Sequence, residues 1–518
     1  MRGPGQRGPA MIEPIPTERP DEPRLPSPSF GAPSVAPSTS ITALIQARAA
    51  EAPDRCAVEH LTASLTYGEL DDASSRLAQH LRQRGIGRGD VVGVFLERSI
   101  AMVIGVLAVL KTGAAYAPQD ARISPRAQLG RIAEQARMRV VLTTERFVGT
   151  MPEGLEVIRV DEPREATSPA FPVASTPSDT CAVIFTSGTT GVPNGVQVSH
   201  GNLVNLLTQA PGDLGITAGT RVGQVLNIAF DMAMWEMFGA LVHGGTLVIR
   251  GTDIAATAER VDVLVATPSI LATLSSHRST AHTVVVAGER CPQALADEWA
   301  RGHRFLNSCG PTEITIINTL VEHHPGRPLT IGAPVPGTSV YVLDPDLRPV
   351  REGESGEMWV GGAGVTAGYI GNPHLTEERY LPDPFAADGS RMFRTRDVGR
   401  WTPQGELEHL SRTDDQVKVR GFRVELDSVS RALESAPGCS AAVTVRRDAR
   451  NLAAVIVPAT VDPDAARTAV AELLPYYCVP TEVVAVDRLP LTPRGKVDRE
   501  AVLRLLDAAA ANPTRVAA

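Results

Sequence analysis

Short apolar runs alternate with longer amphipathic stretches through most of this chain. Four runs predict buried strands, at residues 91–95, 140–143, 246–249 and 284–287, and a stretch such as residues 98–110 predicts a helix. Ser40 is expected to cap a first helix that carries Ile41, Leu44 and Ile45. Strands and helices that alternate in this way indicate an α/β fold.

The pattern also divides the 518 residues into parts. Residues 1–38 are dense in proline and lack apolar periodicity, so we expect a disordered leader there. Short strands broken by Gly, Pro and Asp predict a β-rich subdomain between residues 356 and 410. After Asp414, residues 417–420 are strand-like and residues 424–433 helical. We therefore expect a core at 39–413, a small C-terminal domain at 414–506 and a tail at 507–518.

The composition is ordinary for a globular protein, with 43% apolar and 21% charged residues. A formal net charge of −8 without a basic tract argues against nucleic-acid binding. The longest apolar run, residues 100–110, is too short for a membrane span, and the N-terminus has no apolar signal-peptide core, so we expect a cytoplasmic protein. The six scattered cysteines argue against a disulfide framework or a zinc site.

Lysine is scarce in this chain. Of the 50 basic residues only Lys111, Lys418 and Lys496 are lysines. Where arginine otherwise supplies positive charge, a remaining lysine is favoured for its compact point charge. Lys111 follows an apolar helix, and we expect it to be structural.

Residues 186–195, TSGTTGVPNG, follow the apolar run at residues 181–185. Glycine lets backbone N–H groups approach an oxyanion, and Ser187, Thr189 and Thr190 add hydroxyl donors, which predicts a phosphate-binding loop. The stretch lacks the GxxxxGK[ST] pattern of a Walker A motif. It leads instead into a second strand at residues 196–198, before Ser199 and His200 begin a helix. An ordinary hairpin without a ligand is the alternative that this stretch alone leaves open.

A series of motifs between about residues 40 and 505 resembles the adenylate-forming superfamily, most closely the adenylation domains of nonribosomal peptide synthetases (NRPSs). In family order these are LTYGEL (65–70), LKTGAAYAPQD (110–120), TSGTTGVPNG (186–195), FDMAMWE (230–236), NSCGPTE (307–313), GEMWVGGAGVTAGY (356–369), FRTRD (393–397), SRTDDQVKVRGFRVEL (411–426), LPYYCVP (474–480) and PRGKVDR (493–499). The resemblance implies a large N-terminal domain of two helix-flanked β-sheets with a small β-barrel-like subdomain, followed by a small mobile α+β C-terminal domain.

The chemistry that the resemblance implies is attack of a substrate carboxylate on the α-phosphorus of ATP, which yields an acyl-adenylate and pyrophosphate. The nucleophile is already ionised at neutral pH. Such a reaction therefore depends on positioning and charge neutralisation more than on a general base.

The resemblance also assigns residues to the nucleotide. It places Thr312 at the α-phosphate and Glu313 on Mg²⁺, and a carboxylate beside polyphosphate needs such a cation. The alternative is an ordinary surface glutamate after a Gly-Pro turn. Asp397 would accept the ribose hydroxyls, Arg412 would contact ribose and phosphate, and Asn307 would recognise adenine. Further nucleotide contacts are expected from Thr186, Ser187, Gly188, Thr189, Thr190, Gly191 and Gly310.

Lys496 is the strongest catalytic candidate. In the family this lysine enters the site on the mobile domain and bridges the substrate carboxylate and the nucleotide, whereas a solvated loop lysine is the alternative. Asp414 matches the family's hinge. Rotation there would withdraw Lys496 and bring the strand from Lys418 to Gly421 to the site for thioester formation. A structural salt bridge is an equal alternative for Lys418.

Asp231 resembles the aspartate that pairs with the α-ammonium group of amino-acid substrates, so acids without an amine should be rejected. The other positions of the family's side-chain pocket are Met232, Trp235, Val265, Val285, Ala287, Ser308, Ile316 and Ile317, with Lys496 completing the set. Ser308 is the only hydroxyl in this apolar lining, so a charged side chain would find no partner. Because Met232, Val265 and Ile317 fill space, we expect a branched aliphatic or proline-like substrate rather than an aromatic one.

Three residues depart from the family pattern near the nucleotide. Asn194 stands at the loop's usual lysine, Arg396 at a glycine, and Cys309 at a tyrosine that packs on adenine. Our hypothesis is that Arg396 restores part of the missing charge and that His409 supplies part of the stacking.

Together these features predict an amino-acid adenylating enzyme that uses ATP and Mg²⁺ and loads the phosphopantetheine thiol of a carrier protein. Little more than one helix follows Arg499 and no LGGxS-type site is present, so the carrier is expected in trans. A small MbtH-like helper protein is a further candidate partner, whereas no nucleic acid or membrane is expected. The alternatives are an acyl- or aryl-CoA ligase of the same superfamily, which Asp231 disfavours, and a catalytically weak homologue that acts as a binding partner.

Overall fold

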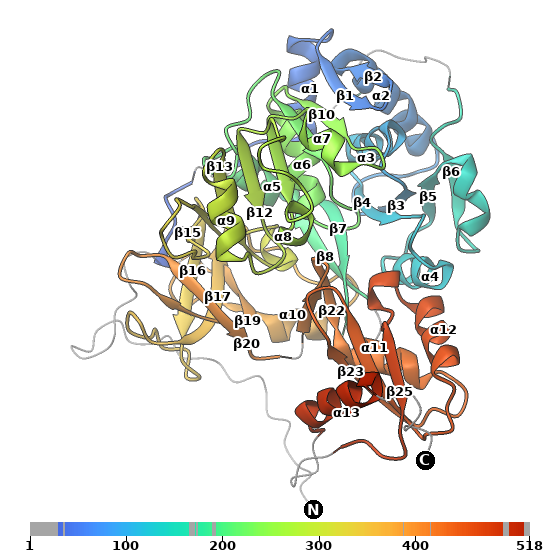
Figure 1. Ribbon diagram of the computed structural model, residues 1–518. Helices are drawn as coiled ribbons and strands as arrows, with labels where there is room; N and C mark the ends of the chain where they lie inside the picture. Colours follow the sequence, from blue (N-terminus) through green and yellow to red (C-terminus); the bar gives the residue numbers. More distant parts are fainter. Residues whose placement is uncertain are drawn as a thin grey trace, which may run out of the picture.

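Two β-sheets flanked by helices make up most of the molecule, as the blue to yellow elements of Figure 1 show. The computed structural model describes residues 29–34, 37–164, 171, 175–188, 193–386, 388–414, 416–490 and 497–511. The six strands of the first sheet, in order across it, are β6 (Glu156–Arg159), β5 (Val140–Thr143), β3 (Val91–Leu96), β4 (Ala115–Asp120), β7 (Thr180–Thr186) and β8 (Asn194–Ser199).

The second sheet has nine strands, parallel at its centre. In order across the sheet they are β15 (Ala333–Pro334), β14 (Thr319–Glu322), β13 (Arg304–Cys309), β12 (Thr283–Val286), β11 (Val263–Ala266), β9 (Arg221–Gln224), β10 (Thr246–Ile249), β1 (Cys56–His60) and β2 (Ala63–Thr66). The predicted fold of helix-flanked sheets is confirmed, and the four predicted strands are β3, β5, β10 and β12, each displaced by at most one residue.

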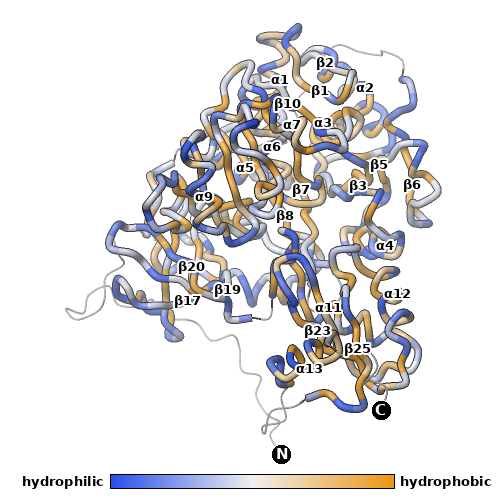
Figure 2. Tube along the Cα trace, viewed as in Figure 1, coloured by the Kyte–Doolittle hydropathy of each residue, from blue (hydrophilic) through white to orange (hydrophobic). Residues whose placement is uncertain are grey.

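Alternate residues of each strand face different cores, because successive side chains of a strand point to opposite faces. Val92 and Val94 of β3 join a large cluster between the two sheets, whereas Val91 and Phe95 face a separate cluster on the other side. The helices that contribute to the central cluster are α1 (Ile41–Glu51), α2 (Tyr67–Gln83), α3 (Ile100–Thr112), α5 (His200–Leu207) and α6 (Met232–Val242). In Figure 2 these buried strands and helices carry much of the orange, apolar colour.

The outer faces of the sheets are covered separately. Helix α4 (Arg126–Gln135) covers the first sheet, and α7 (Ile254–Ala258), α8 (Pro268–Leu271) and α9 (Gln293–Trp299) cover the second. The core is therefore a stack of alternating layers of helices and sheets.

The helix caps explain where the first helices begin. The Ser40 hydroxyl accepts from the backbone N–H of Ala43 at 3.2 Å, so the predicted start of α1 is confirmed. Helix α3 begins after the cap Ser99, two residues later than predicted, and ends at Gly113 with φ of 85°. Lys111 lies inside α3 rather than after it. Its buried ammonium donates to the Asp71 carboxylate at 2.6 Å and to the Ser75 hydroxyl at 2.8 Å, as a structural lysine would.

The predicted β-rich subdomain is an antiparallel sheet of five strands. They are β16 (Thr338–Leu343), β17 (Gly356–Gly362), β19 (Arg391–Trp401), β18 (Tyr380–Pro382) and β20 (Leu407–Arg412), with α10 (Pro373–Arg379) beside them. Phe30 forms a β-bridge with Ser339, and the Gly31 N–H donates to the Thr338 carbonyl at 2.8 Å. The described residues around Phe30 therefore lie against this sheet, unlike the disordered leader expected up to residue 38, while residues 1–28 and 35–36 lie outside the described part.

The C-terminal elements, orange to red in Figure 1, pack around hydrophobic clusters of their own. They comprise the hairpin β21 (Gln416–Val419) and β22 (Phe422–Glu425), the sheet β23 (Ala441–Arg446), β24 (Leu452–Val457) and β25 (Glu482–Ala485), and the helices α11 (Leu426–Glu434), α12 (Pro463–Leu473) and α13 (Arg499–Ala511). The helix expected at residues 424–433 begins at Leu426, because the preceding residues pair as β22. The proposed hinge at Asp414 and the domain limits stay predictions.

No helix among the described residues combines the length and the apolarity that a membrane crossing requires.

Candidate functional site

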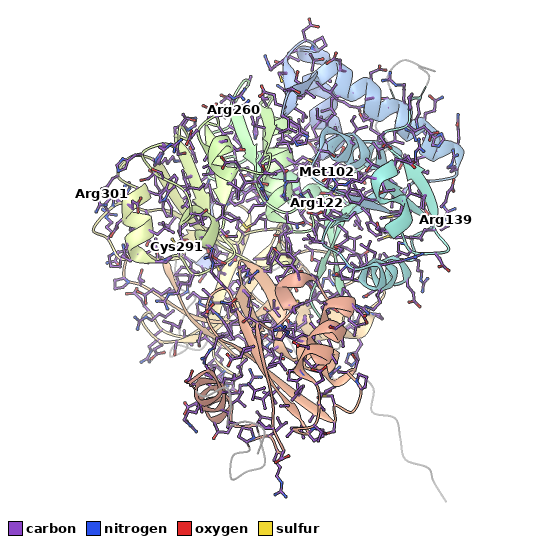
Figure 3. All side chains as sticks on the ribbon, turned by 45° about the vertical axis from the view of Figure 1, so that its right-hand side comes forward. Met102, Arg122, Arg139, Arg260, Cys291 and Arg301 are labelled. Carbon is purple, nitrogen blue, oxygen red and sulfur yellow. The ribbon has the colours of Figure 1, made fainter. Side chains whose placement is uncertain are left out.

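A cleft of about 1720 Å³ lies where the carboxyl ends of the parallel strands β9, β11, β12 and β13 meet the five-stranded sheet and the β21–β22 hairpin. Ligands of open α/β sheets bind at such strand ends. Figure 3 places the cleft residues Arg122 and Cys291 on different sides of this junction, above the C-terminal elements. The cleft brings together residues as far apart in the sequence as Arg98 and Tyr476, which are separated by 378 positions.

The glycine-rich stretch joins β7 to β8, which pair antiparallel, so the predicted strand-to-strand connection is confirmed. Thr189, Thr190 and Gly191 lie outside the described residues. Thr186, Ser187 and Gly188 face the C-terminal hairpin, where the Ser187 hydroxyl donates to the Arg423 carbonyl at 3.0 Å. Phosphate binding by this loop stays a prediction.

Asp397 and Arg412 lie directly opposite each other on β19 and β20. Arg412 donates from Nη1 to Asp397 Oδ1 at 2.6 Å, and His409 Nε2 lies 3.1 Å from the same oxygen. Burial acts to raise the pKa of Asp397, but the hydrogen bond with His409 and the charge of Arg412 outweigh it and lower that pKa. Asp397 is therefore an ionised acceptor at the edge of the cleft, where the resemblance expects the ribose.

Asn307, Cys309 and Gly310 line the same cleft at the end of β13. Asn307 donates from its side-chain amide to the Thr330 carbonyl at 2.6 Å. A Cβ atom added to Gly310 would lie only 2.4 Å from the Cα of Ile317, so the close approach of the two backbones requires glycine here. His409 lines the cleft as well, as the stacking hypothesis requires.

Glu313 is fully buried in the short 3-10 helix η3 (Thr312–Ile314), so the alternative of an ordinary surface glutamate is wrong. Its carboxylate accepts from Arg423 Nη1 at 3.1 and 2.9 Å and from the Tyr369 hydroxyl at 2.7 Å. Burial acts to raise the pKa of Glu313, but the charges of Arg423 and Arg379 outweigh it and lower that pKa. Glu313 is held ionised by a cation of the protein itself.

This arrangement does not fit a magnesium ion on Glu313. Protein donors already contact both carboxylate oxygens. Arg423 is the cation beside Glu313 in this arrangement, and magnesium binding by Glu313 stays a prediction.

Asp231 stands at the start of α6 and lines the cleft. Burial raises the pKa of Asp231 to about 6, although a hydrogen bond with the Thr312 hydroxyl opposes the rise. Among the described residues, no arginine or lysine forms an ion pair with it. Met232, Ala287, Ser308 and Ile316 line the same cleft, and their contact with a substrate stays a prediction.

Trp235, Val265, Val285 and Ile317 do not line the cleft in this arrangement. They lie in the central hydrophobic cluster behind Met232 and Ala287, at most 2% exposed. Trp235 also donates from Nε1 to the Gly212 carbonyl at 2.8 Å, which turns its ring into the core. These residues limit the depth of the pocket rather than forming its surface.

The chain matches the model of the family described as AMP-binding enzyme over residues 45–370. It belongs to the AMP-binding enzyme family. Its curated relatives include adenylate-forming reductase 06235 of Coprinopsis cinerea, 46% identical over 470 residues, which cover 88% of this chain and 46% of that protein. The isonitrile lipopeptide synthase of Mycobacterium tuberculosis is 40% identical over 485 residues, which cover 89% of this chain and 19% of that protein.

A solved structure agrees with this family. It is the holo form of an NRPS protein containing adenylation and PCP domains, bound to a vinylsulfonamide inhibitor, with a TM-score of 0.81 and 26% identity. The match covers 90% of this chain and 84% of that one. This AMP-binding enzyme is thus an adenylate-forming enzyme of the NRPS type, and it spans about half or less of the length of the curated relatives named above.

The hairpin β21–β22 of this AMP-binding enzyme enters the cleft with Lys418, Gly421 and Arg423. Gly421 has a φ of 82° and lies so close to Thr267 that a Cβ atom would be 2.6 Å from its Cγ2, so only glycine fits. The charge of Lys418 lowers the pKa of Asp397 after the stronger effects of His409 and Arg412. Lys496 lies outside the described residues.

Sequence reasoning missed an aromatic contact at the same junction. The ring of Phe230, next to Asp231, lies 4.8 Å from Phe422 of the hairpin, which in turn stacks on Tyr477 at 4.1 Å between ring centroids. Phe230 and Phe422 were visible only as members of motifs, without a signal that they meet.

Arg396 is placed differently from our hypothesis. Its Nη2 donates to Glu378 Oε1 at 2.7 Å and its Nη1 lies 3.8 Å from Asp414, and it is not among the residues that line the cleft. Its φ of 62° lies in the left-handed region, which explains why the family has glycine at this position.

Proposed function

We propose that this enzyme activates an apolar α-amino acid with ATP and Mg²⁺, releases pyrophosphate, and transfers the aminoacyl group to the phosphopantetheine thiol of a carrier protein. The observation that carries the proposal is the carboxylate of Asp231, which lines the cleft together with the apolar residues Met232, Ala287 and Ile316. A carboxylate in such surroundings is costly to desolvate unless a cation arrives with the ligand, and the α-ammonium group of an amino acid is that cation.

The proposed positions of the two substrates follow from the geometry. The nucleotide would lie along Asp397, His409 and Asn307, with the glycine-rich loop at its phosphates. The amino-acid side chain would lie among Met232, Ala287 and Ile316. Because Trp235 and Val285 fill the space behind these residues, a branched aliphatic or proline-like side chain fits the proposal better than an aromatic ring.

Carrier-protein transfer is supported by the arrangement of the hairpin. Lys418 and Gly421 lie in the cleft, as the family resemblance expects for thioester formation. The similar NRPS structure contains a PCP domain in the same protein. We include an MbtH-like helper protein among the candidate partners, but no described feature argues for one.

A second candidate is activation of a carboxylic acid that lacks an amine. Its support is that two of the curated relatives, at 46% and 42% identity, are adenylate-forming reductases of Coprinopsis cinerea. In that case Asp231 would have a role other than ammonium binding.

ATP–pyrophosphate exchange across a panel of amino acids and simple carboxylic acids tests the proposal. We expect exchange with small apolar amino acids, a loss of at least about 100-fold in Lys496→Ala, and no exchange with the matching acids that lack the amine. Exchange only with acids that lack an amine would favour the second candidate. No exchange with any acid would contradict both candidates and favour a homologue that only binds.

A further inference from the structure

Glu236 is a buried carboxylate to which the proposed function assigns no role. It lies in α6, five residues after Asp231, and its side chain is 0% exposed. It is not among the residues that line the cleft, so it does not contact a ligand there. A carboxylate is costly to bury unless hydrogen bonds and nearby charges compensate for the lost water. The contacts of Glu236 therefore indicate what this residue does.

Glu236 turns back onto the loop that leads from β9 to α6. Its Oε1 accepts from the backbone N–H of Val225 at 2.8 Å and from that of Leu226 at 3.2 Å. Its Oε2 accepts from the same Leu226 N–H at 3.2 Å. Burial raises the pKa of Glu236 to about 8, although these N–H donors oppose the rise. Because both groups are donors, the ionised carboxylate is the form that makes all of these contacts.

Two arginines hold the carbonyl groups of the same two residues. Arg250, which follows β10, donates from Nε to the Val225 carbonyl at 2.9 Å. Arg98, which lies beyond the end of β3, donates from Nη1 to the Leu226 carbonyl at 3.2 Å. The positive charges of both arginines also favour the ionised form of Glu236. The backbone at the start of the loop is thus fixed by one carboxylate and two guanidiniums, which come from both sheets.

The loop that is fixed in this way ends at Asp231. Only four residues separate Leu226 from Asp231, and they are bonded to one another. The Asn227 carbonyl accepts from the Phe230 N–H at 3.1 Å, and its side-chain Oδ1 accepts from the Ala229 N–H at 2.9 Å. A short loop with these internal bonds moves as a unit. A shift of Leu226 would therefore displace the Asp231 carboxylate, which needs an accurate position to pair with a cation.

We propose that Glu236 is a positioning residue for Asp231. Together with Arg98 and Arg250 it fixes the loop at residues 225–230, and it thereby sets the affinity for the α-ammonium group of the substrate. This inference rests on the proposed function. It separates Glu236 from a residue that only stabilises the fold, because a loss of positioning affects ligands with the amine more than ligands without it.

Isothermal titration calorimetry with adenylate analogues tests the proposal without turnover. The probes are valyl-sulfamoyl adenosine and prolyl-sulfamoyl adenosine, each compared with the matching acyl-sulfamoyl adenosine that lacks the amine. Glu236→Gln replaces one acceptor oxygen by an NH₂ group, which faces N–H donors. For the amine-bearing probe that the wild-type protein prefers, we expect about 10-fold to 100-fold weaker binding. The matching probe without the amine should change by less than about threefold.

Two further variants distinguish positioning from a general loss of structure. Asp383→Asn is the matched control. Asp383 is also a buried carboxylate that accepts from two successive N–H groups, those of Phe385 at 2.9 Å and Ala386 at 3.2 Å, but it does not line the cleft. Its substitution should leave the ratio of the two affinities unchanged. In an Asp231→Asn background, Glu236→Gln should cause little further loss, because both residues act through the same ammonium contact.

Three results would overturn the inference. They are an unchanged affinity ratio in a folded Glu236→Gln, an equal change of the ratio in Asp383→Asn, and additive effects of Asp231→Asn and Glu236→Gln. Thermal melts establish folding, and Glu236→Asp, whose side chain is one methylene shorter, is used if Glu236→Gln does not fold.

The wild-type protein separates failure of this inference from failure of the proposed function. Equal binding of the probes with and without the amine would overturn the ammonium-binding role of Asp231, and with it the proposed function and this inference. A wild-type preference for the amine that persists in Glu236→Gln would overturn the role of Glu236 alone.

Discussion

Arg412 holds the carboxylate of Asp414 through two hydrogen bonds, from Nε to Oδ1 at 2.8 Å and from Nη2 to Oδ2 at 3.0 Å. The same guanidinium donates to Asp397 at 2.6 Å. The predicted ribose-binding residue and the predicted hinge are thus joined by one side chain. A planar guanidinium can make these contacts together, whereas an ammonium group cannot reproduce the fork.

We therefore predict that Arg412→Lys weakens adenylation although it keeps the charge. Loss of a charge-assisted hydrogen bond costs about 1.5–3 kcal/mol, so kcat/KM for ATP should fall about 10-fold to 100-fold. Steady-state pyrophosphate exchange measures this. Arg400→Lys is the control, because Arg400 makes an exposed pair with Glu408 in the same two strands. Equal effects of the two substitutions would show that the fork is unimportant.

Asp231 gives a prediction about pH. Its pKa is raised to about 6, so the free enzyme loses the carboxylate, which is the proposed partner of the substrate ammonium, as the pH falls through that value. KM for the amino acid should rise below about pH 6, and Asp231→Asn should remove this limb of the profile. A pKa above that of the unfolded chain also means that the ionised form disfavours folding above pH 6. Asp231→Asn should therefore melt a few degrees higher at pH 7–8. A lower melting temperature of Asp231→Asn at pH 7–8 would contradict the conclusion that burial of the ionised Asp231 carboxylate destabilises the folded protein.

We predict different effects when Ile316 and its neighbour Ile317 are each replaced by alanine. Ile316 lines the cleft, so Ile316→Ala should shift the preference in pyrophosphate exchange toward larger apolar amino acids by about 10-fold. Ile317 lies behind the cleft in the core. Ile317→Ala should cost about 2–5 kcal/mol of folding free energy without changing the order of preferred substrates. A change of selectivity in the Ile317 variant alone would contradict the placement of the two side chains.

A substitution of Arg396 tests whether the positive charge of this residue contributes to nucleotide binding. Its pair with Glu378 is partly exposed, and such pairs contribute about 0.2–1 kcal/mol. Arg396→Gly also relieves the left-handed backbone, so KM for ATP should change less than about fivefold and the melting temperature little. A tenfold rise in KM for ATP would restore the original hypothesis that Arg396 serves the nucleotide.

The strands and helices of the core could be predicted from the sequence because the local pattern of apolar and polar residues shows which positions are buried. Val92 and Val94 face one cluster while Val91 and Phe95 face the other, and the run is apolar throughout for that reason. Strand β22 was missed because its four residues follow only a two-residue turn, formed by Arg420 and Gly421, and look like the start of α11.

The motifs identified most of the residues of the candidate site, but not the contacts between these residues. The hydrogen bond between Arg423 and Glu313 joins residues that are 110 positions apart. It depends on how the C-terminal elements pack against the core, and a local sequence pattern does not predict this packing. The direction of the Trp235 ring is decided by the Gly212 carbonyl behind it. The left-handed backbone at Thr315 and Ile316, with φ of 64° and 72°, is equally invisible, since β-branched residues rarely adopt it.

The stack of Phe230, Phe422 and Tyr477 links the part of the cleft beside Asp231 to the C-terminal elements, so that ligand binding there and the packing of these elements are parts of one equilibrium. A ligand that presses on Phe230 must change the free energy of the docked arrangement, and docking must change the affinity for that ligand by the same factor. Substrate preference in this enzyme is therefore not a property of the pocket walls alone. Under the proposed function, two amino acids of equal fit can still differ in how readily each allows transfer to the carrier protein to begin.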